Sequence, residues 1–150
     1  LGTAPALLAN RVSFLLDFRG PSEAVHTACS SALVVVHRAA RSVLSGECEL
    51  AIAGAVSLML SPQTFVSTSR LGVLSPDGRC RTFDARANGY VKGEGVGVVV
   101  LKPLARALAD GDPIRGVLIG TGENHGGRAN SMTAPNPTAQ AELIAGVIGR

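Results

Sequence analysis

Apolar and polar positions repeat along this chain with two periods, one typical of helices and the other of strands. From Thr3 to Phe18 the apolar residues are spaced as in an amphipathic helix, which Arg19-Gly20-Pro21 ends. Three further segments are predicted to be helices, and they are Pro62 to Ser69, Pro103 to Asp110 and Ala139 to Ile148. One more predicted helix, between the first of these and Pro21, is described below. Apolar runs typical of strands cover Cys48 to Ser57, Val91 to Leu101 and Ile114 to Gly122.

Two segments between these elements are rich in turn-forming residues and are predicted to be loops. They are Leu71 to Asn88, which contains Ser75-Pro76-Asp77-Gly78, and Gly126 to Pro137. The alternation of strands and helices along the chain predicts a layered α/β architecture.

One cysteine lies where a predicted strand meets a predicted helix. A short strand over residues 24–28 leads to a tight turn at Cys29, and the apolar run from Leu33 begins a helix that ends at Ser45-Gly46. Three consecutive valines in this run also suit a buried strand. At a helix start, free N–H groups favour the nucleophilic thiolate, and a neighbouring N–H can stabilise an oxyanion. A cysteine among Ala, Val and Leu can equally be a small buried apolar residue.

Composition narrows the class of protein. With 150 residues, 46% hydrophobic and 3% aromatic, the chain can bury a core built from Val, Leu, Ile and Ala. The net charge is +3, and the densest basic cluster, Arg79-Cys80-Arg81, is far short of a nucleic-acid-binding stripe. We therefore expect no nucleic-acid partner, although surface arginines could attract an acidic protein.

The three cysteines, Cys29, Cys48 and Cys80, are odd in number and lack metal-type spacing. With no signal peptide in the sequence, we expect free thiols in the cytoplasm and no bound metal. The apolar runs are too short to span a bilayer, so no membrane association is expected.

The residues around Cys29 resemble the active-site motif of β-ketoacyl synthases, most closely the ketosynthase domains of modular type I polyketide synthases. The motif is Thr27-Ala28-Cys29-Ser30-Ser31. Further matches occur in the family's order over nearly the whole chain, including Ala9-Asn10-Arg11-Val12-Ser13, Leu74-Ser75-Pro76-Asp77-Gly78-Arg79-Cys80, Gly93-Glu94-Gly95-Val96-Gly97 and Thr133-Ala134-Pro135-Asn136. The run from Asn124 to Ser131, with Thr133 to Pro137, resembles ketosynthases served by separate acyltransferases.

The resemblance implies the thiolase-like α/β/α/β/α layered fold, in which the helix after Cys29 is one of two buried central helices. In this family the strand before the cysteine lies at a twofold dimer interface, so Ser22 to Ala28 is expected to contact a second copy. Residues 1–150 are expected to be an incomplete central portion of a single ketosynthase domain, truncated at both ends.

The resemblance also implies the chemistry, with Cys29 as the catalytic nucleophile. It would accept an acyl group from a phosphopantetheine thioester, and decarboxylative Claisen condensation with a malonyl-type extender on an acyl carrier protein would follow in polyketide chain elongation. No cofactor is expected to bind directly, because the carrier protein's phosphopantetheine arm delivers the substrates. Thr133, in a loop that borders the pantetheine tunnel in the family, is the expected contact for that arm.

The family's two catalytic histidines stand in motifs like His-Gly-Thr-Gly-Thr and Asn-x-Gly-His, which this chain lacks. We therefore expect the 150 residues alone to be inactive in condensation. Two alternatives stay open: a non-elongating ketosynthase that only transfers or holds acyl chains, and a fatty-acid-type condensing enzyme.

The chain's own histidines are expected to have other roles. His26, where the family usually carries an acidic or amide residue, is expected to serve a structural or interface role. His37, two helical turns beyond Cys29, is expected to pack, and His125 to lie at a pocket rim. Asp84 and Glu94 suggest either a buried polar network near the site or salt bridges with Arg86 or Lys92.

Overall fold

The structure is a computed structural model, and it describes residues 4–149. These residues belong to two compact units. Unit 1 runs to Gly54 and resumes at Val98, and unit 2 comprises Ala55–Gly97. Each unit is described by itself.

Unit 1 contains most of the helices. It begins with α1 (Leu7–Leu15), and Cys29 lies in a short 3-10 turn, η1 (Ala28–Ser30), that leads directly into α2 (Ser31–Leu44). Its second half contains α4 (Leu104–Ala109) and α5 (Pro137–Ile148). The predicted first helix is confirmed but shorter than expected, and its expected start at Thr3 lies outside the described residues.

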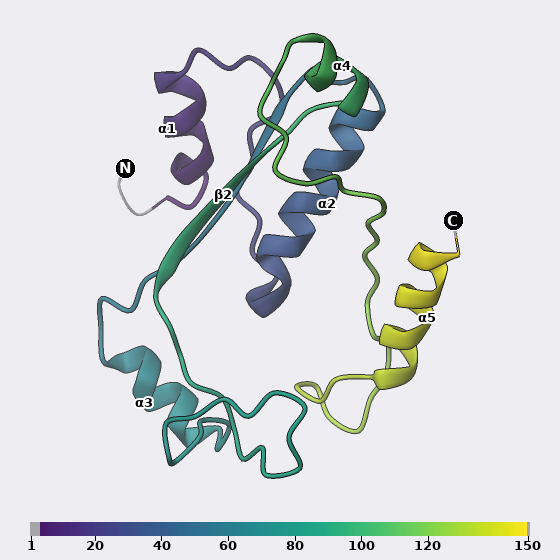
Figure 1. Ribbon diagram of the computed structural model, residues 1–150. Coiled ribbons are helices and arrows are strands. Elements are labelled where there is room, and N and C mark those ends of the chain that lie inside the picture. Colours follow the sequence, from purple (N-terminus) through teal and green to yellow (C-terminus); the bar gives the residue numbers. More distant parts are fainter. Residues whose placement is uncertain (1–3, 150) are drawn as a thin grey trace. The chain divides into compact units, whose positions relative to one another are not determined.

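The two strands pair with each other in one two-stranded sheet. The chain runs out along β1 (Ala51–Ser57) and returns along β2 (Gly95–Leu101), so the strands are antiparallel (Figure 1). Both are shorter than the apolar runs that predict them, which begin at Cys48 and at Val91. The apolar run over Cys48 to Ser57 is also typical of a buried strand, but Ala53 is the one residue of β1 that is buried.

The core of unit 1 is built from small side chains. Among the described residues the buried apolar side chains are Ala40 and Val43 of α2, Ala53 of β1 and Ala107 of α4. α2 runs alongside the part of the strand pair that belongs to unit 1 (Figure 1). Larger apolar side chains stay in solvent, and Phe14 is 84% and Ile119 97% exposed. Because folded monomers rarely leave so much apolar surface uncovered, these residues do not complete a hydrophobic core by themselves.

Two predicted strands are absent. Residues 24–27 form neither a helix nor a strand, Ala28 already belongs to η1, and residues 114–122 are likewise without regular structure; no strand of the described chain bonds to either segment. An apolar run becomes a strand only when its amide and carbonyl groups find partners on a neighbouring strand. The local pattern indicates an apolar, extended segment in each case, but the pairing that would make it a strand is missing.

Unit 2 holds α3 (Gln63–Arg70) and the long loop that follows it. The helix agrees with the prediction, and Pro62 precedes it with a φ of −64°, a value already suited to a helix start. The loop is ordered, as predicted from its turn residues. Two backbone hydrogen bonds join its ends, Ser75 N–H to Tyr90 O at 2.9 Å and Tyr90 N–H to Val73 O at 3.0 Å.

Ser75 is the centre of the loop's side-chain contacts. Its Oγ lies 2.5 Å from Asp77 Oδ1 and 2.9 Å from Asn88 Oδ1, and the Arg81 guanidinium bonds Asp77 at 2.6 Å. The hydrogen bond from Arg81, with a smaller one from Ser75, holds the pKa of Asp77 well below its usual range. The charged form of Asp77 is therefore the one that the loop stabilises.

Closing this loop requires a glycine at position 89. Gly89 has a φ of +137°, and a Cβ there would lie 2.5 Å from Ser75 N and 2.6 Å from the Leu74 carbonyl carbon. The contacts are with backbone atoms, which cannot rotate away as a flexible side chain could.

We predict that Gly89→Ala lowers the free energy of unfolding by about 3 kcal/mol, because it adds backbone strain and a clash with rigid atoms. Gly93→Ala is the matched control, since a Cβ at Gly93 has nothing within 4 Å. Its effect should stay within about 1 kcal/mol. Urea denaturation of both variants measures the difference, and equal stabilities would contradict this role for Gly89.

Candidate functional site

The turn that carries Cys29 has an unusual backbone. Ala28, immediately before the cysteine, has a φ of +54°, in the left-handed region that residues with a Cβ seldom occupy. The 3-10 turn then leads straight into α2. The side chain of Cys29 is exposed, so the turn presents the sulfur to solvent.

Three hydroxyl side chains hold this turn together. The Ser31 Oγ accepts the Thr27 N–H at 2.8 Å and donates to the Ala28 carbonyl oxygen at 2.7 Å. The Ser30 hydroxyl lies 2.8 Å from Thr27 O and 2.9 Å from Thr27 Oγ1. Together these bonds fix the two residues that precede Cys29. Sequence reasoning singled out the cysteine and missed this network, although the Thr-x-x-Ser-Ser spacing is a signal for local side-chain capping.

The predicted helix start at Cys29 is confirmed with one refinement. α2 has 14 residues and begins two positions after the cysteine, so the three valines are helical and the strand alternative is wrong. No side-chain hydrogen bond caps this helix from its N-cap residue, Ser30. The first amide groups of α2 therefore follow Cys29 directly in the chain, and the Ser30 side chain caps none of them.

None of the three histidines is hydrogen-bonded to Cys29. The His26 Nδ1 accepts the Ala28 N–H at 3.4 Å, and the His125 Nδ1 accepts the Gly127 N–H at 3.0 Å. His37 is half-buried, and its Nδ1 lies 2.7 Å from Thr121 Oγ1. The histidines thus hold the backbone or join segments of unit 1.

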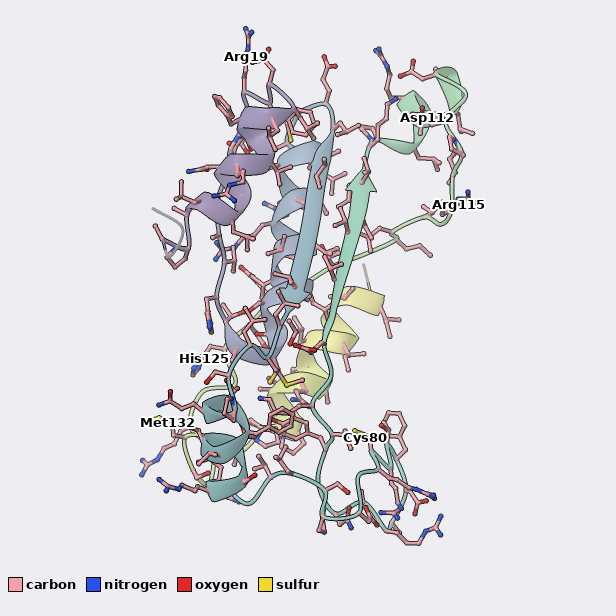
Figure 2. All side chains as sticks on the ribbon, turned by 90° about the vertical axis from the view of Figure 1, so that its left-hand side faces the viewer. Arg19, Cys80, Asp112, Arg115, His125 and Met132 are labelled. Carbon is pink, nitrogen blue, oxygen red and sulfur yellow. The ribbon has the colours of Figure 1, made fainter. Side chains whose placement is uncertain are left out.

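Thr133 lies in the predicted loop between residue 126 and α5. Its side chain is exposed, and its Oγ1 lies 3.4 Å from the Ser131 hydroxyl. The Asn136 side-chain amide donates to Gly126 O at 2.7 Å, which closes the loop at its base. His125 and Met132 mark this loop in Figure 2, and the Met132 side chain is fully exposed. The role of Thr133 in substrate binding stays a prediction.

The two acidic residues singled out in the sequence do not share a network. Asp84 forms a salt bridge with Arg86 at 2.7 Å, one of the two partners expected for the salt-bridge alternative. Hydrogen bonds from the Arg86 side chain, and then from its backbone, lower the pKa of Asp84. Glu94 instead accepts a hydrogen bond from the Met59 N–H. Because Asp84 is partly exposed and Arg86 largely so, the suggested buried network is wrong.

A shallow cavity of about 620 Å³ lies elsewhere in unit 1. It is lined by Pro21, Ser22, Glu23, His37, Arg38, Arg41, Ser42, Glu47 and Glu123, and Cys29 is not among them. This cavity is open, and five of its nine lining residues are charged.

The other cysteines differ from Cys29 in their surroundings. Cys48 is half-buried, whereas the Cys80 Sγ is exposed and accepts the Val91 N–H at 3.0 Å. All three are free thiols. Within residues 4–149, no three His, Cys, Asp or Glu side chains lie close enough together to hold a metal ion. Over the same residues, no helix is long and apolar enough to cross a membrane.

Comparison with known proteins gives a consistent result. Residues 1–107 match the family described as "Beta-ketoacyl synthase, N-terminal domain". The chain is 52% identical over 141 residues to the polyketide synthase ThaG of Burkholderia thailandensis, covering 94% of the chain and 2% of that protein. It is 50% identical over 140 residues to the polyketide synthase PksR of Bacillus subtilis 168, covering 93% of the chain and 6% of that protein. The chain therefore spans only a small part of the length of these relatives.

Two solved structures share its fold. The ketosynthase from module 6 of the bacillaene synthase of Bacillus subtilis 168 superposes with a TM-score of 0.96 at 42% identity, covering 99% of this chain and 26% of that one. The oxazolomycin ketosynthase domain OzmH KS7 of Streptomyces albus JA3453 gives 0.94 at 44% identity, covering 97% and 26%. The predicted thiolase-like α/β fold is confirmed, and this chain covers about a quarter of the length of each of these two solved chains.

We predict that Ser31→Ala loosens the Cys29 turn, because it removes both hydrogen bonds of the Ser31 hydroxyl. The loss should be about 1 kcal/mol, so the Thr27 amide should exchange with solvent about fivefold faster. Ser45→Ala is the matched control, since the Ser45 hydroxyl bonds Ser42 O at the opposite end of α2. Amide hydrogen exchange followed by NMR measures the effect. Unchanged protection of Thr27 in Ser31→Ala would show that the hydroxyl does not hold the turn.

Proposed function

Because the chain belongs to the β-ketoacyl synthase family, we propose that it carries the nucleophile of a polyketide ketosynthase, Cys29. In this proposal, Cys29 accepts an acyl group from a phosphopantetheine thioester. The complete domain then joins that group to a malonyl-type extender in polyketide chain elongation. The observation that carries the proposal is the exposed Cys29 thiol on a hydrogen-bonded, left-handed turn directly before α2.

Acyl transfer to Cys29 exchanges one thioester for another. The thiolate attacks the carbonyl carbon of the incoming acyl group, and a tetrahedral oxyanion forms. When the oxyanion collapses, the pantetheine thiolate leaves and takes up a proton. Backbone N–H groups are effective donors for such an oxyanion when they are held in place before the reaction. The Ser30 and Ser31 hydroxyls support this role by fixing the backbone of the two residues before the cysteine.

Condensation then makes a carbon–carbon bond. The malonyl-type extender loses its carboxylate as CO₂, and the enolate left behind attacks the carbonyl carbon of the acyl-cysteine. The Cys29 thiolate leaves, and the β-ketoacyl product stays on the carrier. Donors must stabilise the enolate and the oxyanion, and in the family two histidines do this from motifs that this sequence does not contain.

The proposal includes two protein partners and a compartment. An acyl carrier protein would bring both substrates on its phosphopantetheine arm, and the exposed Thr133 is our candidate contact for that arm. The segment from Ser22 to Ala28 is mostly exposed and pairs with no strand of the described chain, which suits the dimer contact expected of it. Three free thiols are in keeping with a reducing cytoplasm.

We predict that Cys29→Ala lowers the rate at which an acyl-pantetheine thioester acylates the chain by about tenfold or more, because the nucleophile is lost. Cys48→Ala and Cys80→Ala are the controls and should still be acylated. Intact-protein mass spectrometry followed by peptide mapping gives the modified residue. Acylation that persists in Cys29→Ala, on either of the other cysteines, would overturn the assignment.

We also predict that the 150 residues alone form no β-ketoacyl product, since the two histidine motifs are not in this sequence. The assay supplies acyl-pantetheine and a malonyl-loaded acyl carrier protein, and it follows the product by mass spectrometry. A complete ketosynthase domain serves as the positive control. Turnover by the 150 residues would refute this part of the proposal.

A further inference from the structure

Two histidines of unit 1 make the same unusual backbone contact. In each, the imidazole Nδ1 accepts the N–H of the residue two positions ahead: Ala28 for His26, at 3.4 Å, and Gly127 for His125, at 3.0 Å. In each, the residue that donates has a positive φ, +54° for Ala28 and +66° for Gly127. Because the same contact, with a donor residue of positive φ, occurs at two unrelated positions, we interpret the contact at His26 as a defined local turn.

The contact imitates a turn that aspartate and asparagine usually make. A side-chain oxygen of these residues accepts the N–H two positions ahead, and this steadies the turn. The chain contains such an example as well, since Asp84 Oδ1 accepts the Arg86 N–H at 2.8 Å. At His26 a ring nitrogen takes the place of that oxygen. The difference is chemical, because histidine changes charge between pH 5 and 8, whereas asparagine does not change at all.

The amide that His26 binds belongs to the strained residue of the Cys29 turn. The hydroxyl of Ser31 already bonds the carbonyl side of Ala28, at 2.7 Å. His26 supplies the partner on its N–H side, so both polar backbone groups of Ala28 have side-chain partners. A left-handed alanine persists only when its surroundings hold it there. Removal of the His26 contact frees one of those two groups.

We propose that His26 is a positioning residue for Cys29 and that it acts only while its imidazole is neutral. The inference deepens the proposed function and rests on it for its significance, because it assigns a residue that shapes the turn carrying the proposed nucleophile. His26 acts through Ala28 and makes no hydrogen bond to Cys29 among the described contacts.

The protonation state of the His26 ring decides whether its Nδ1 can accept the Ala28 N–H. Only a neutral imidazole has a lone pair on Nδ1, and in the protonated ring both nitrogens are donors. The turn therefore keeps this contact while the imidazole is neutral and loses it when the ring is protonated. The ring is exposed, and no ion pair to it occurs in the part of the chain that the structure describes. The acidic residue nearest to it in sequence, Glu23, pairs with Arg38 at 3.3 Å.

The test uses a chemical reaction of the thiols that needs no acyl transfer. Iodoacetamide alkylation of Cys29 and Cys80 is measured in the same sample of the full chain, from pH 8 to pH 5.5, by peptide mass spectrometry. Cys80 is the internal reference, because both thiols are exposed and unit 2 contains no histidine. The same measurement on His26→Asn gives the change of this ratio with pH that does not involve the histidine.

Relative to His26→Asn, the ratio of Cys29 to Cys80 alkylation should fall about threefold across this range in the wild-type chain, a change that one hydrogen bond of ordinary net strength supports. His26→Asn is the reference because the asparagine oxygen accepts the Ala28 N–H at every pH. His37→Gln, which alters the contact with Thr121 instead, should keep the wild-type fall.

Two results would overturn the inference: a wild-type ratio that changes with pH as it does in His26→Asn, or a wild-type ratio that rises above that of His26→Asn at low pH. The second would show a direct attraction between a protonated imidazole and the thiolate. Hydrogen exchange of the Ala28 amide gives a second reading, with protection lost at low pH in the wild type alone. If this inference is wrong, Cys29 can still be the residue that is acylated. If Cys29 is not acylated, the alkylation ratio still tests whether His26 positions the Cys29 turn.

Discussion

The strained turn at Ala28 is the constraint on which the site depends. Alanine does not adopt a left-handed conformation by preference, and here neighbouring hydroxyls and an imidazole hold it there. The consequence is geometric: the chain turns sharply enough to leave Cys29 exposed at the point where α2 begins. The free energy that the hydrogen bonds supply is used to hold a conformation that an unsupported chain would leave.

The local parts of this arrangement could be predicted from the sequence. The helix after Cys29, the turn at the cysteine and the helices α3, α4 and α5 all follow from the spacing of apolar residues and from breakers such as Pro62 and Gly46. These elements depend on contacts within a few residues. The hydroxyl network of Thr27, Ser30 and Ser31 is also local, but a list of residues does not show that it would hold Ala28 at a positive φ.

The sequence-based predictions that are wrong concern strand pairing and burial, which depend on contacts between residues far apart in the sequence. Residues 24–27 and 114–122 have strand-like sequences, yet they form no strand and bond to no strand of the described chain. β2 is equally apolar, and it becomes a strand because β1 lies beside it. The same limit explains Asp84 and Glu94, which lie close in sequence to other charges but bind different partners. A sequence pattern indicates which residues can pair, whereas the rest of the fold decides which of them do.

The central claim is that Cys29 is the thiol that receives the acyl group, and a protection experiment tests it most directly. The chain is first treated with an acyl-pantetheine thioester and then with iodoacetamide, and the alkylated cysteines are mapped by mass spectrometry. The account predicts that acylation shields Cys29 while Cys80 is alkylated as in the untreated chain. Equal alkylation of Cys29 with and without the thioester, or shielding of Cys80 in its place, would contradict it.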